Sequence, residues 1–295
     1  TTDGEAGALD ADMSQLNAVA PVSVVIPAFR AKATIAEAID SVAKQTLLPL
    51  EVIVVDDGSK DGTGDFAREL ALRYDPAWLK VLELSENQGA ASARNAGWAA
   101  ARGELIAFLD ADDRWHPNKI EYQYEYMCMH PDVALCGHGY RIAPDLEASV
   151  DLPYPTQAED IRPLRLLLFN PLVTPSVMVR ASVPFRFMSG KRHTDDHLLW
   201  MEIALSGLRV VRLSAPLALI SKPMFGAGGL SSQMWAMEKG ELHNYWHLKT
   251  AGMIGLPAAI GLMAFSLAKY VRRLLIVAFR RAASLVRGDN HATLQ

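Results

Sequence analysis

Cysteine, and basic residues near the N-terminus, are what this chain most clearly lacks. Only Cys128 and Cys136 occur among the 295 residues, in a spacing that fits neither a zinc site nor a redox pair. This composition favours a reducing compartment. No Lys or Arg precedes Arg30 and no apolar run opens the chain, so the sequence predicts no secretory signal. The formal net charge of -4 argues against a general nucleic-acid partner.

Two phosphate-binding glycine motifs are also missing. The predicted first strand, at 22–26, is followed by Pro27 rather than by the dinucleotide-binding glycine pattern. The sequence also contains no phosphate-cradling loop that ends in Lys followed by Ser or Thr. These absences argue against a hydride-transferring enzyme and against a nucleoside triphosphatase.

Strand and helix patterns alternate along the first part of the chain. Apolar runs predict strands at 22–26, 51–55, 79–84 and 105–109, and helical spacing predicts helices at 33–44, 61–74 and 90–101. Nearly continuous apolar strands of this kind form a mostly parallel sheet with helices on both faces. The patterns further predict helices at 118–129, 162–169 and 195–206, and strands at 133–140, 172–179 and 209–213.

Polar residues follow each predicted parallel strand, at 28–30, 56–59, 87–89 and 110–113. Ligands of such sheets bind at the carboxyl ends of the strands. The last segment holds Asp110, Asp112 and Asp113, and adjacent carboxylates without a counter-charge drive at least one of them toward protonation. A divalent cation that prefers oxygen ligands is the simplest group that neutralises them. A polar turn would explain one or two of these residues.

Four motifs occur in a fixed order, at 22–29, 51–59, 87–95 and 108–113. Together they resemble the family 2 glycosyltransferases, which are inverting nucleotide-sugar enzymes. The resemblance covers residues 22 to about 210 and implies the GT-A fold, a Rossmann-like α/β architecture with a mostly parallel central sheet flanked by helices. A helical, membrane-associating appendage is expected at the C-terminal end.

The resemblance implies roles for residues on the donor side. Asp57 is expected to accept a hydrogen bond from the nucleotide base, typically uracil. Pro27, Ala28, Phe29 and Arg30 are expected to wall the nucleotide. The structural alternatives are a turn-forming role for Asp57 and core packing for Phe29.

The acidic stretch matches the family's Asp-x-Asp motif at Asp110, Ala111 and Asp112. The resemblance implies that Asp110 faces the ribose or the metal and that Asp112 coordinates Mg²⁺ or Mn²⁺ with the donor diphosphate. Asp113 is expected to help through a bound water. Arg94 is expected to face the acidic cluster or the diphosphate, because a guanidinium stays charged and binds oxyanions; a solvated helix-face arginine is the alternative.

On the acceptor side, residues 194–200 are similar to the family's Glu-Asp motif, which opens a helix beside the acceptor. Asp196 then aligns with the catalytic base and Asp195 supports it, although two carboxylates also suit any helix N-terminus. His197 and Trp235 are further candidates for acceptor contacts. The family's processive members carry Gln-x-x-Arg-Trp, but this chain has Gln233-Met234-Trp235 without the Arg, which favours transfer of a single sugar.

The C-terminal segment carries charges of one sign. From 256 to 288 every charged residue is basic, and Lys269, Arg273, Arg280 and Arg287 recur at helical intervals. A basic amphipathic helix is typical of a membrane-surface element. A membrane span, at 250–268, and a helix that packs on the catalytic domain or on a second subunit of a homo-oligomer remain alternatives.

The predicted organisation is a flexible lead-in at 1–20, a catalytic domain at 21–235, C-terminal amphipathic helices at 236–288 and a tail at 289–295. The catalytic domain would comprise a nucleotide-binding half, 21–115, and an acceptor half, 116–235. We expect a metal-dependent transfer from a UDP-sugar to a saccharide, linked to polyprenyl diphosphate, in exopolysaccharide biosynthesis at the cytoplasmic face of the cell membrane. A sugar nucleotidyltransferase and an inactive sugar-nucleotide-binding scaffold are the alternatives, and no nucleic-acid partner is expected.

Overall fold

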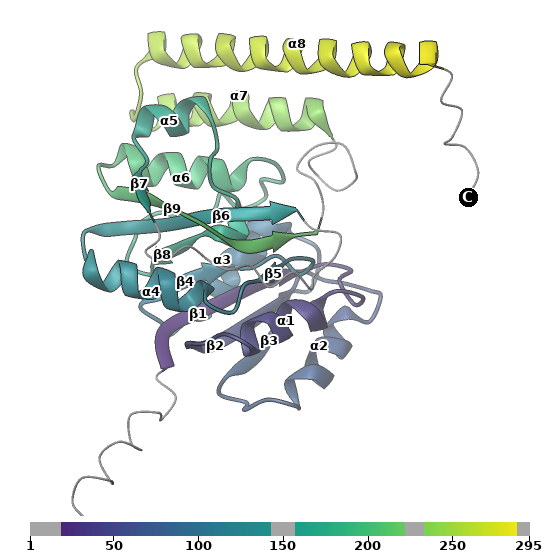
Figure 1. Cartoon of the computed structure of the whole chain (residues 1–295), viewed down its shortest axis with the longest axis vertical. Coiled ribbons are helices and arrows are strands. Elements are labelled where there is room, and N and C mark those ends of the chain that lie inside the picture. Colours follow the sequence, from purple (N-terminus) through teal and green to yellow (C-terminus); the bar gives the residue numbers. More distant parts are fainter. Residues whose placement is uncertain (1–18, 143–156, 222–232, 288–295) are drawn as a thin grey trace, which may run out of the picture. The chain divides into compact units, whose positions relative to one another are not determined.

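The computed structural model describes residues 19–142, 157–221 and 233–287 (Figure 1). The chain divides into two compact units, Thr1–Pro223 and Met224–Gln295. The larger unit has an α/β fold, with one sheet and its flanking helices. The described residues of the smaller unit form a helix pair.

The larger unit is built on one nine-stranded sheet with the order β3-β2-β1-β4-β8-β6-β9-β5, in which β7 pairs with β9 at the side. The strands are β1 Val19–Ala28, β2 Leu48–Asp56, β3 Leu79–Glu83, β4 Leu105–Phe108, β5 Arg114–Trp115, β6 Val133–Ile142, β7 Ala158–Asp160, β8 Met178–Arg180 and β9 Arg209–Ile220. β1 to β4 are mutually parallel, whereas β8 runs antiparallel to both β4 and β6. The predicted parallel sheet is therefore confirmed in the first half, and the second half is mixed.

The helices of the larger unit are α1 Ile35–Ala43, α2 Thr63–Ala71, α3 Ala90–Ala100, α4 Lys119–Met129, α5 Pro163–Leu168 and α6 Asp195–Leu205, with a 3₁₀ turn, η2, at Thr174–Ser176. α1 illustrates why they form: Ile35, Ala38, Ile39 and Val42 recur at helical spacing and are all buried. α1 thus contributes an apolar stripe that packs against the sheet.

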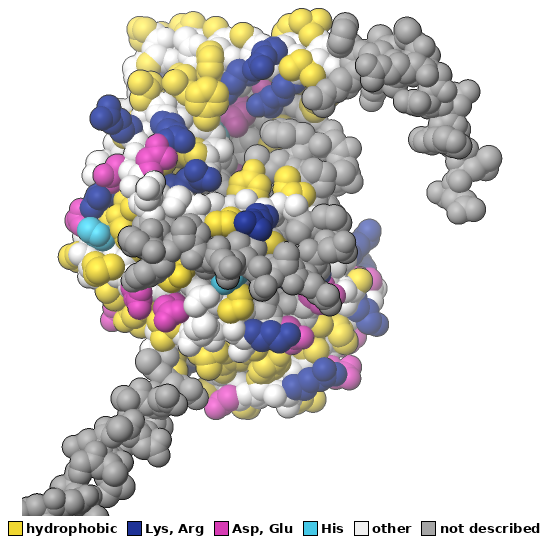
Figure 2. All heavy atoms as spheres, in the orientation of Figure 1, with side chains coloured by type: hydrophobic (Ala, Val, Ile, Leu, Met, Phe, Trp, Pro, Cys, Tyr) yellow, Lys and Arg dark blue, Asp and Glu magenta, His cyan; other side chains and the backbone are white. Residues whose placement is uncertain are grey.

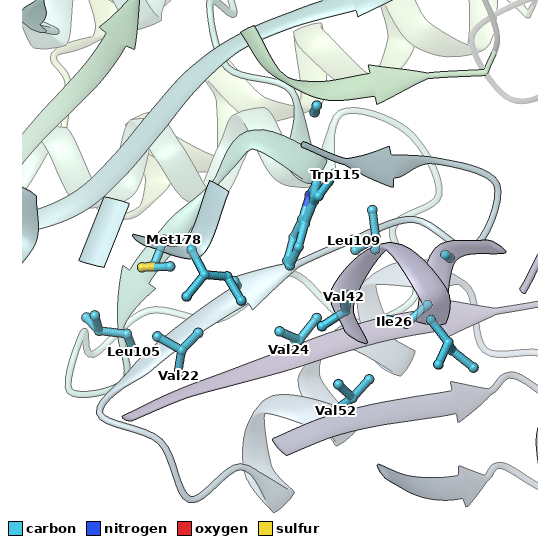
Figure 3. Packing of buried hydrophobic residues seen from close by; sticks show 14 of the residues in the cluster. Val22, Val24, Ile26, Val42, Val52, Leu105, Leu109, Trp115 and Met178 are labelled. Atoms are coloured by element: carbon cyan, nitrogen blue, oxygen red, sulfur yellow. The ribbon is translucent and has the colours of Figure 1, made fainter. Parts of the chain in front are cut away.

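The core contains side chains of β1 and its neighbouring strands packed against α1 and α4, and Figure 3 shows part of it. Val22, Val24 and Ile26 alternate along β1, so that their side chains share one face of the sheet and are fully buried. Val42 of α1 and Trp115 of β5 belong to the same buried cluster. This packing fixes the carboxyl ends of β1 and β4, from which the polar loops emerge.

A buried carboxylate ties the strands together near the start of β2. The Glu51 side chain is fully buried and accepts hydrogen bonds from Ser23 Oγ at 2.7 Å, Lys80 Nζ at 2.8 Å and Arg102 Nε at 2.9 Å. Burial opposes the charge, but these hydrogen bonds outweigh it and lower the pKa of Glu51 to about 2. Glu51 therefore links β1, β2, β3 and the turn before β4.

Three predicted elements differ from the observed ones. The strand expected at 172–179 is split into η2 and the short β8, because Pro175 lies in the 3₁₀ turn. β5 was not predicted, since two residues carry no periodicity, and it forms by antiparallel pairing with β9. β9 continues to Ile220, well beyond the expected end at 213, because it pairs with β6 along most of its length.

The smaller unit consists of α7 Met234–Thr250 and α8 Leu256–Arg287, which pack against each other. Ala259, Leu262 and Ser266 recur at intervals of three and four residues along α8 and are buried. Across the part of the chain that the structure describes, no helix is long and apolar enough to cross a membrane. The alternative of a span at 250–268 therefore has no support within the described residues.

Candidate active site

The polar loops predicted to converge do meet at one edge of the sheet. Ala28, the last residue of β1, pairs with Asp56, the last residue of β2, and Val25 pairs with Phe108 at the end of β4. Because β1, β2 and β4 are parallel, the loops that follow them leave the sheet at the same edge. The backbone N–H of Asp57 donates to Ala28 O at 2.8 Å, which fixes the first two loops to each other.

Asp57 is buried and its carboxylate holds the third loop. Gln88 N donates to Oδ1 at 2.7 Å and Gly89 N donates to Oδ2 at 2.8 Å. Each oxygen of an ionised carboxylate has a further lone pair, so Asp57 can still accept from a ligand. Gly58 is required next to it, because its φ is +67° and a Cβ there would lie 2.5 Å from the backbone carbon of Glu86.

The residues expected to wall the nucleotide fall into two kinds. Phe29 is 44% exposed, so core packing does not account for it, and the Arg30 guanidinium lies 5.2 Å from the centre of its ring. Arg30 has a φ of +52° and its N–H donates to Ser59 Oγ at 2.9 Å. By contrast, the Ala28 side chain is buried in the core and Pro27 is half-buried, so these two residues contribute mainly backbone.

Arg94 joins two carboxylates that lie far apart in the sequence. Its Nη2 donates to Asp110 Oδ1 at 2.7 Å and its Nη1 donates to Asp195 Oδ2 at 3.2 Å. The guanidinium is buried and lies 5.3 Å from the centre of the Phe187 ring. Burial disfavours its charge, but Asp110 and Asp195 outweigh this effect and raise the pKa of Arg94. Arg94 therefore faces the acidic cluster, one of the two predicted positions.

The side chains of the acidic stretch, 110–113, differ in how exposed they are to solvent. Ala111 is buried in the hydrophobic core, and Asp113 is buried with Oδ1 accepting from Ser221 N at 2.9 Å. Asp110 keeps 31% of its side chain exposed, and Asp112 is half-buried. The two Asp-x-Asp carboxylates are thus the more accessible ones.

This donor set fits a divalent cation that is shared with a ligand. Among the residues placed by the structure, no group of three or more His, Cys, Asp or Glu side chains forms a complete metal cage. Mg²⁺ is commonly held by one or two carboxylates, with phosphate oxygens and waters completing its octahedron. Asp110 and Asp112 provide such a pair, and the prediction that Asp113 assists remains a prediction.

The helix α6 brings the second pair of carboxylates to the site. Thr194, with a φ of +55°, starts the helix. Asp195 is buried, and burial raises its pKa to about 6, with Asp196 adding to the shift and Arg94 opposing it. Asp196 is half-buried; its Oδ2 accepts from Thr174 Oγ1 at 3.2 Å and its Oδ1 accepts from His197 N at 2.7 Å. Asp196 is the more accessible carboxylate of this pair.

The two lesser acceptor-side candidates have other contacts. His197 is buried and its Nε2 lies 2.7 Å from Leu166 O, so the ring packs α6 against α5 rather than facing open space. Trp235 belongs to the smaller unit, where its ring lies 5.5 Å from that of Tyr270. An acceptor contact by Trp235 remains a prediction.

Two residues that sequence reasoning missed make hydrogen bonds close to the candidate site. Asn95 Nδ2 donates to Phe187 O at 2.7 Å while its Oδ1 accepts from Phe187 N at 3.1 Å, and Thr174 donates to Asp196. Asn95 closes the third predicted motif, so its position in that motif was the available signal. Thr174 carried no such signal.

The fold and the carboxylate site define a glycosyltransferase, as the four motifs predict. Residues 23–174 match the family model described as glycosyl transferase family 2. The chain belongs to this family.

Similar proteins agree with this assignment. The chain is 42% identical over 106 residues to the UDP-Glc:alpha-D-GlcNAc-diphosphoundecaprenol beta-1,3-glucosyltransferase WfgD of Escherichia coli, which covers 36% of this chain and 40% of that protein. The chain spans less than half the length of the first curated relatives that it matches.

Solved structures confirm the GT-A fold. S. aureus TarS 1-349 in complex with UDP-GlcNAc is similar with a TM-score of 0.64 and 21% identity, covering 83% of this chain and 71% of that one. The mannosyltransferase PcManGT from Pyrobaculum calidifontis, in complex with GDP-Man and Mn2+, has a TM-score of 0.59 and 19% identity, covering 90% and 80%. At these identities the likeness concerns the fold alone.

Proposed function

We propose that this glycosyltransferase moves one sugar from a UDP-sugar to a saccharide acceptor, with inversion at the transferred carbon and with the help of a divalent cation. The observation that carries the proposal is the pairing of Arg94 with both Asp110 and Asp195. This pairing brings the Asp-x-Asp motif and the α6 carboxylates, which are about 85 residues apart, into one site.

The donor is expected to bind over the loops that follow β1, β2 and β3. Asp57 would accept a hydrogen bond from the base, since Gln88 and Gly89 already hold its carboxylate in place. The exposed ring of Phe29 is available for stacking on the base. The choice of UDP rests on WfgD, whose name gives UDP-Glc as its donor.

Asp110 and Asp112 would hold the cation, Mg²⁺ or Mn²⁺, against the donor diphosphate. When bound, such an ion offsets the charge that develops on the leaving nucleoside diphosphate. The negative charge of Asp110 is already shared with Arg94, which leaves Asp112 as the principal ligand.

Asp196 would act as the general base. As the acceptor oxygen bonds to the anomeric carbon, the bond from that carbon to the diphosphate breaks and Asp196 takes the hydroxyl proton. Thr174 donates to Oδ2 and the helix backbone donates to Oδ1, so both oxygens are held in a defined orientation. Asp195 lies one residue earlier and is engaged with Arg94, which suits a supporting role.

The acceptor is proposed to be linked to polyprenyl diphosphate. WfgD is named for a GlcNAc-diphosphoundecaprenol acceptor, and such an acceptor would place the reaction at the inner face of the cell membrane, in exopolysaccharide assembly. The absence of Arg from Gln233-Met234-Trp235 favours the addition of one sugar per acceptor.

Assays of donor hydrolysis and of sugar transfer distinguish the proposed role of Asp112 in metal binding from that of Asp196 as the base. With UDP-sugars and Mn²⁺, Asp112→Asn should abolish both reactions, and added EDTA should do the same to the unchanged protein. Asp196→Asn should keep donor binding, measured by calorimetry, but lose transfer by at least 100-fold. Glu125→Gln, an exposed carboxylate on α4, is the matched control and should behave as the unchanged protein. Full transfer by the Asp112 variant would contradict the metal assignment.

A further inference from the structure

Within the helix pair, α8 carries an apolar face that α7 does not cover. Leu256, Ile260, Leu267, Val271 and Leu274 recur at intervals of three, four and seven residues, so they lie along one side of the helix. Their side chains are 39–60% exposed, and the neighbouring Leu275 is 66% exposed. Figure 2 shows hydrophobic side chains gathered along this helix. We name these six residues the outer apolar face.

This face is not needed for the packing of α8 on α7. The residues that α8 buries, Ala259, Leu262 and Ser266, lie on a different side of the helix, offset from the outer apolar face by about a quarter turn or more. Soluble proteins seldom leave a continuous row of large aliphatic side chains in water unless it is an interaction site. The outer apolar face therefore requires an occupant.

The charges around this face indicate its nature. No charged residue occurs from Leu256 to Ala268, and every charge from there to Arg287 is positive. Arg272 is exposed at the margin of the outer apolar face, next to Leu275, whereas Arg273 lies on the side of the helix that carries Leu262 and Ser266. Burial lowers the pKa of Lys269, and the nearby carboxylates Glu238 and Glu241 of α7 partly oppose this lowering. Lys269 is therefore turned toward α7. The predicted positive stripe is thus partly engaged within the helix pair.

We propose that the outer apolar face of α8 docks on a lipid bilayer, with the helix axis in the plane of the surface and Arg272 on the anionic headgroups. A helix that lies in the interface combines such an apolar face with cations at its margin. The described helices are too polar to span, which leaves a surface position. This inference rests on the proposed lipid-linked acceptor for its role, because it brings the enzyme to the surface that holds that substrate.

A second copy of the chain is a poorer occupant. α8 contains no acidic residue from Leu256 to Arg287, so two α8 helices in contact, in either direction, would offer the cations no opposite charge. A paired-helix seam also needs only a narrow stripe. Here the exposed apolar residues extend around the helix to Leu275 and Phe265.

Vesicle binding of the full-length chain tests the proposal. The probe is phosphatidylcholine vesicles with and without 25% phosphatidylglycerol, at 150 mM salt, read by co-sedimentation. The unchanged protein should bind, and more tightly to the anionic vesicles. Leu267→Glu with Val271→Glu should weaken binding at least tenfold on both. Leu72→Glu, at a leucine that is 86% exposed on α2, is the matched control and should have no effect.

Removal of the cations gives a separate readout. Arg272→Gln should reduce the preference for anionic vesicles about fivefold, while binding to neutral vesicles stays. Arg273→Gln, on the α7 side of the helix, should keep that preference. No vesicle binding by the unchanged protein, or unchanged binding by the double Glu variant, would overturn the proposal. So would a solution dimer, seen by light scattering, that the double Glu variant dissociates. All these variants should hydrolyse a soluble UDP-sugar at the same rate as the unchanged protein. If neither the unchanged protein nor any variant hydrolyses it, the result counts against the proposed function and not against the membrane-binding surface.

Discussion

The buried ion pair between Arg94 and Asp195 gives a prediction with a defined sign and size. Arg94→Met keeps the length and the apolar stem of the side chain but removes the charge. Asp195 then stays buried beside Asp196 without its counter-charge, and Asp110 loses the same partner. Removal of one member of a buried pair typically costs about 3–5 kcal/mol of unfolding free energy.

The pH dependence follows from the direction of the pKa shift. The pKa of Asp195 is already raised to about 6 from its ordinary 3.8, with burial as the main cause. Between these values the folded protein binds more protons than the unfolded chain, so this group makes stability fall as pH rises. A shift of about two pH units corresponds to roughly 3 kcal/mol. Without Arg94 the pKa of Asp195 should rise further, so the decline should extend above pH 6.

Urea denaturation followed by circular dichroism, in EDTA at pH 5 and pH 8, measures both effects. Arg94→Met should be destabilised at both values and more strongly at pH 8. Asp195→Asn placed in the same background should remove the additional loss at pH 8. Arg165→Met, which breaks an exposed ion pair with Glu159, should cost less than about 1 kcal/mol and show no such slope. An Arg94 variant that behaves like this control would refute the reasoning.

Three further predictions concern single contacts. Thr174→Val should lower the rate of sugar transfer about tenfold with little change in donor KM, because it removes a hydrogen bond to Asp196; steady-state kinetics tests this, and an equal loss with Thr174→Ser would contradict it. Glu51→Gln should cost about 3 kcal/mol at pH 7. Because the pKa of Glu51 is lowered to about 2, its stabilisation is present above pH 4.5 and lost as pH falls toward 2, so denaturation curves should converge with the wild type in acid. Gly58→Ala should cost about 2 kcal/mol or more, owing to its φ of +67° and the contact with Glu86, and should weaken UDP binding by calorimetry.

The sequence predicted the parts of the fold whose signals are local. The four parallel strands and the helices between them follow from apolar runs and helical spacing, and their carboxyl-end loops converge as expected because parallel strands share one edge. β5 and the length of β9 depend on pairing between distant segments, and no local pattern reports such pairing. η2 had a local signal in Pro175, which interrupts the apolar run at 172–179.

The site shows the same division. The motif residues were identified by their order in the chain, and Arg94 lies where one of its two predicted roles requires. Its contact with Asp195 spans 101 residues, so the link between the donor and acceptor carboxylates became visible only in the fold. His197 was predicted as a candidate acceptor contact, with a packing histidine as the alternative, and its Nε2 lies 2.7 Å from Leu166 O.

The side chain of Asn95 has a consequence for how this enzyme can change. Its amide donates to the carbonyl of Phe187 and accepts from the N–H of the same residue, as a paired residue of a neighbouring strand would, and so anchors an irregular segment to α3. Asp196, the proposed base, lies nine residues beyond that anchor. The stretch between β8 and Phe187 is also held in place, because Ala181 N donates to Glu104 O at 2.9 Å and Val183 is buried. Insertions there would therefore disturb the segment that leads to Asp196.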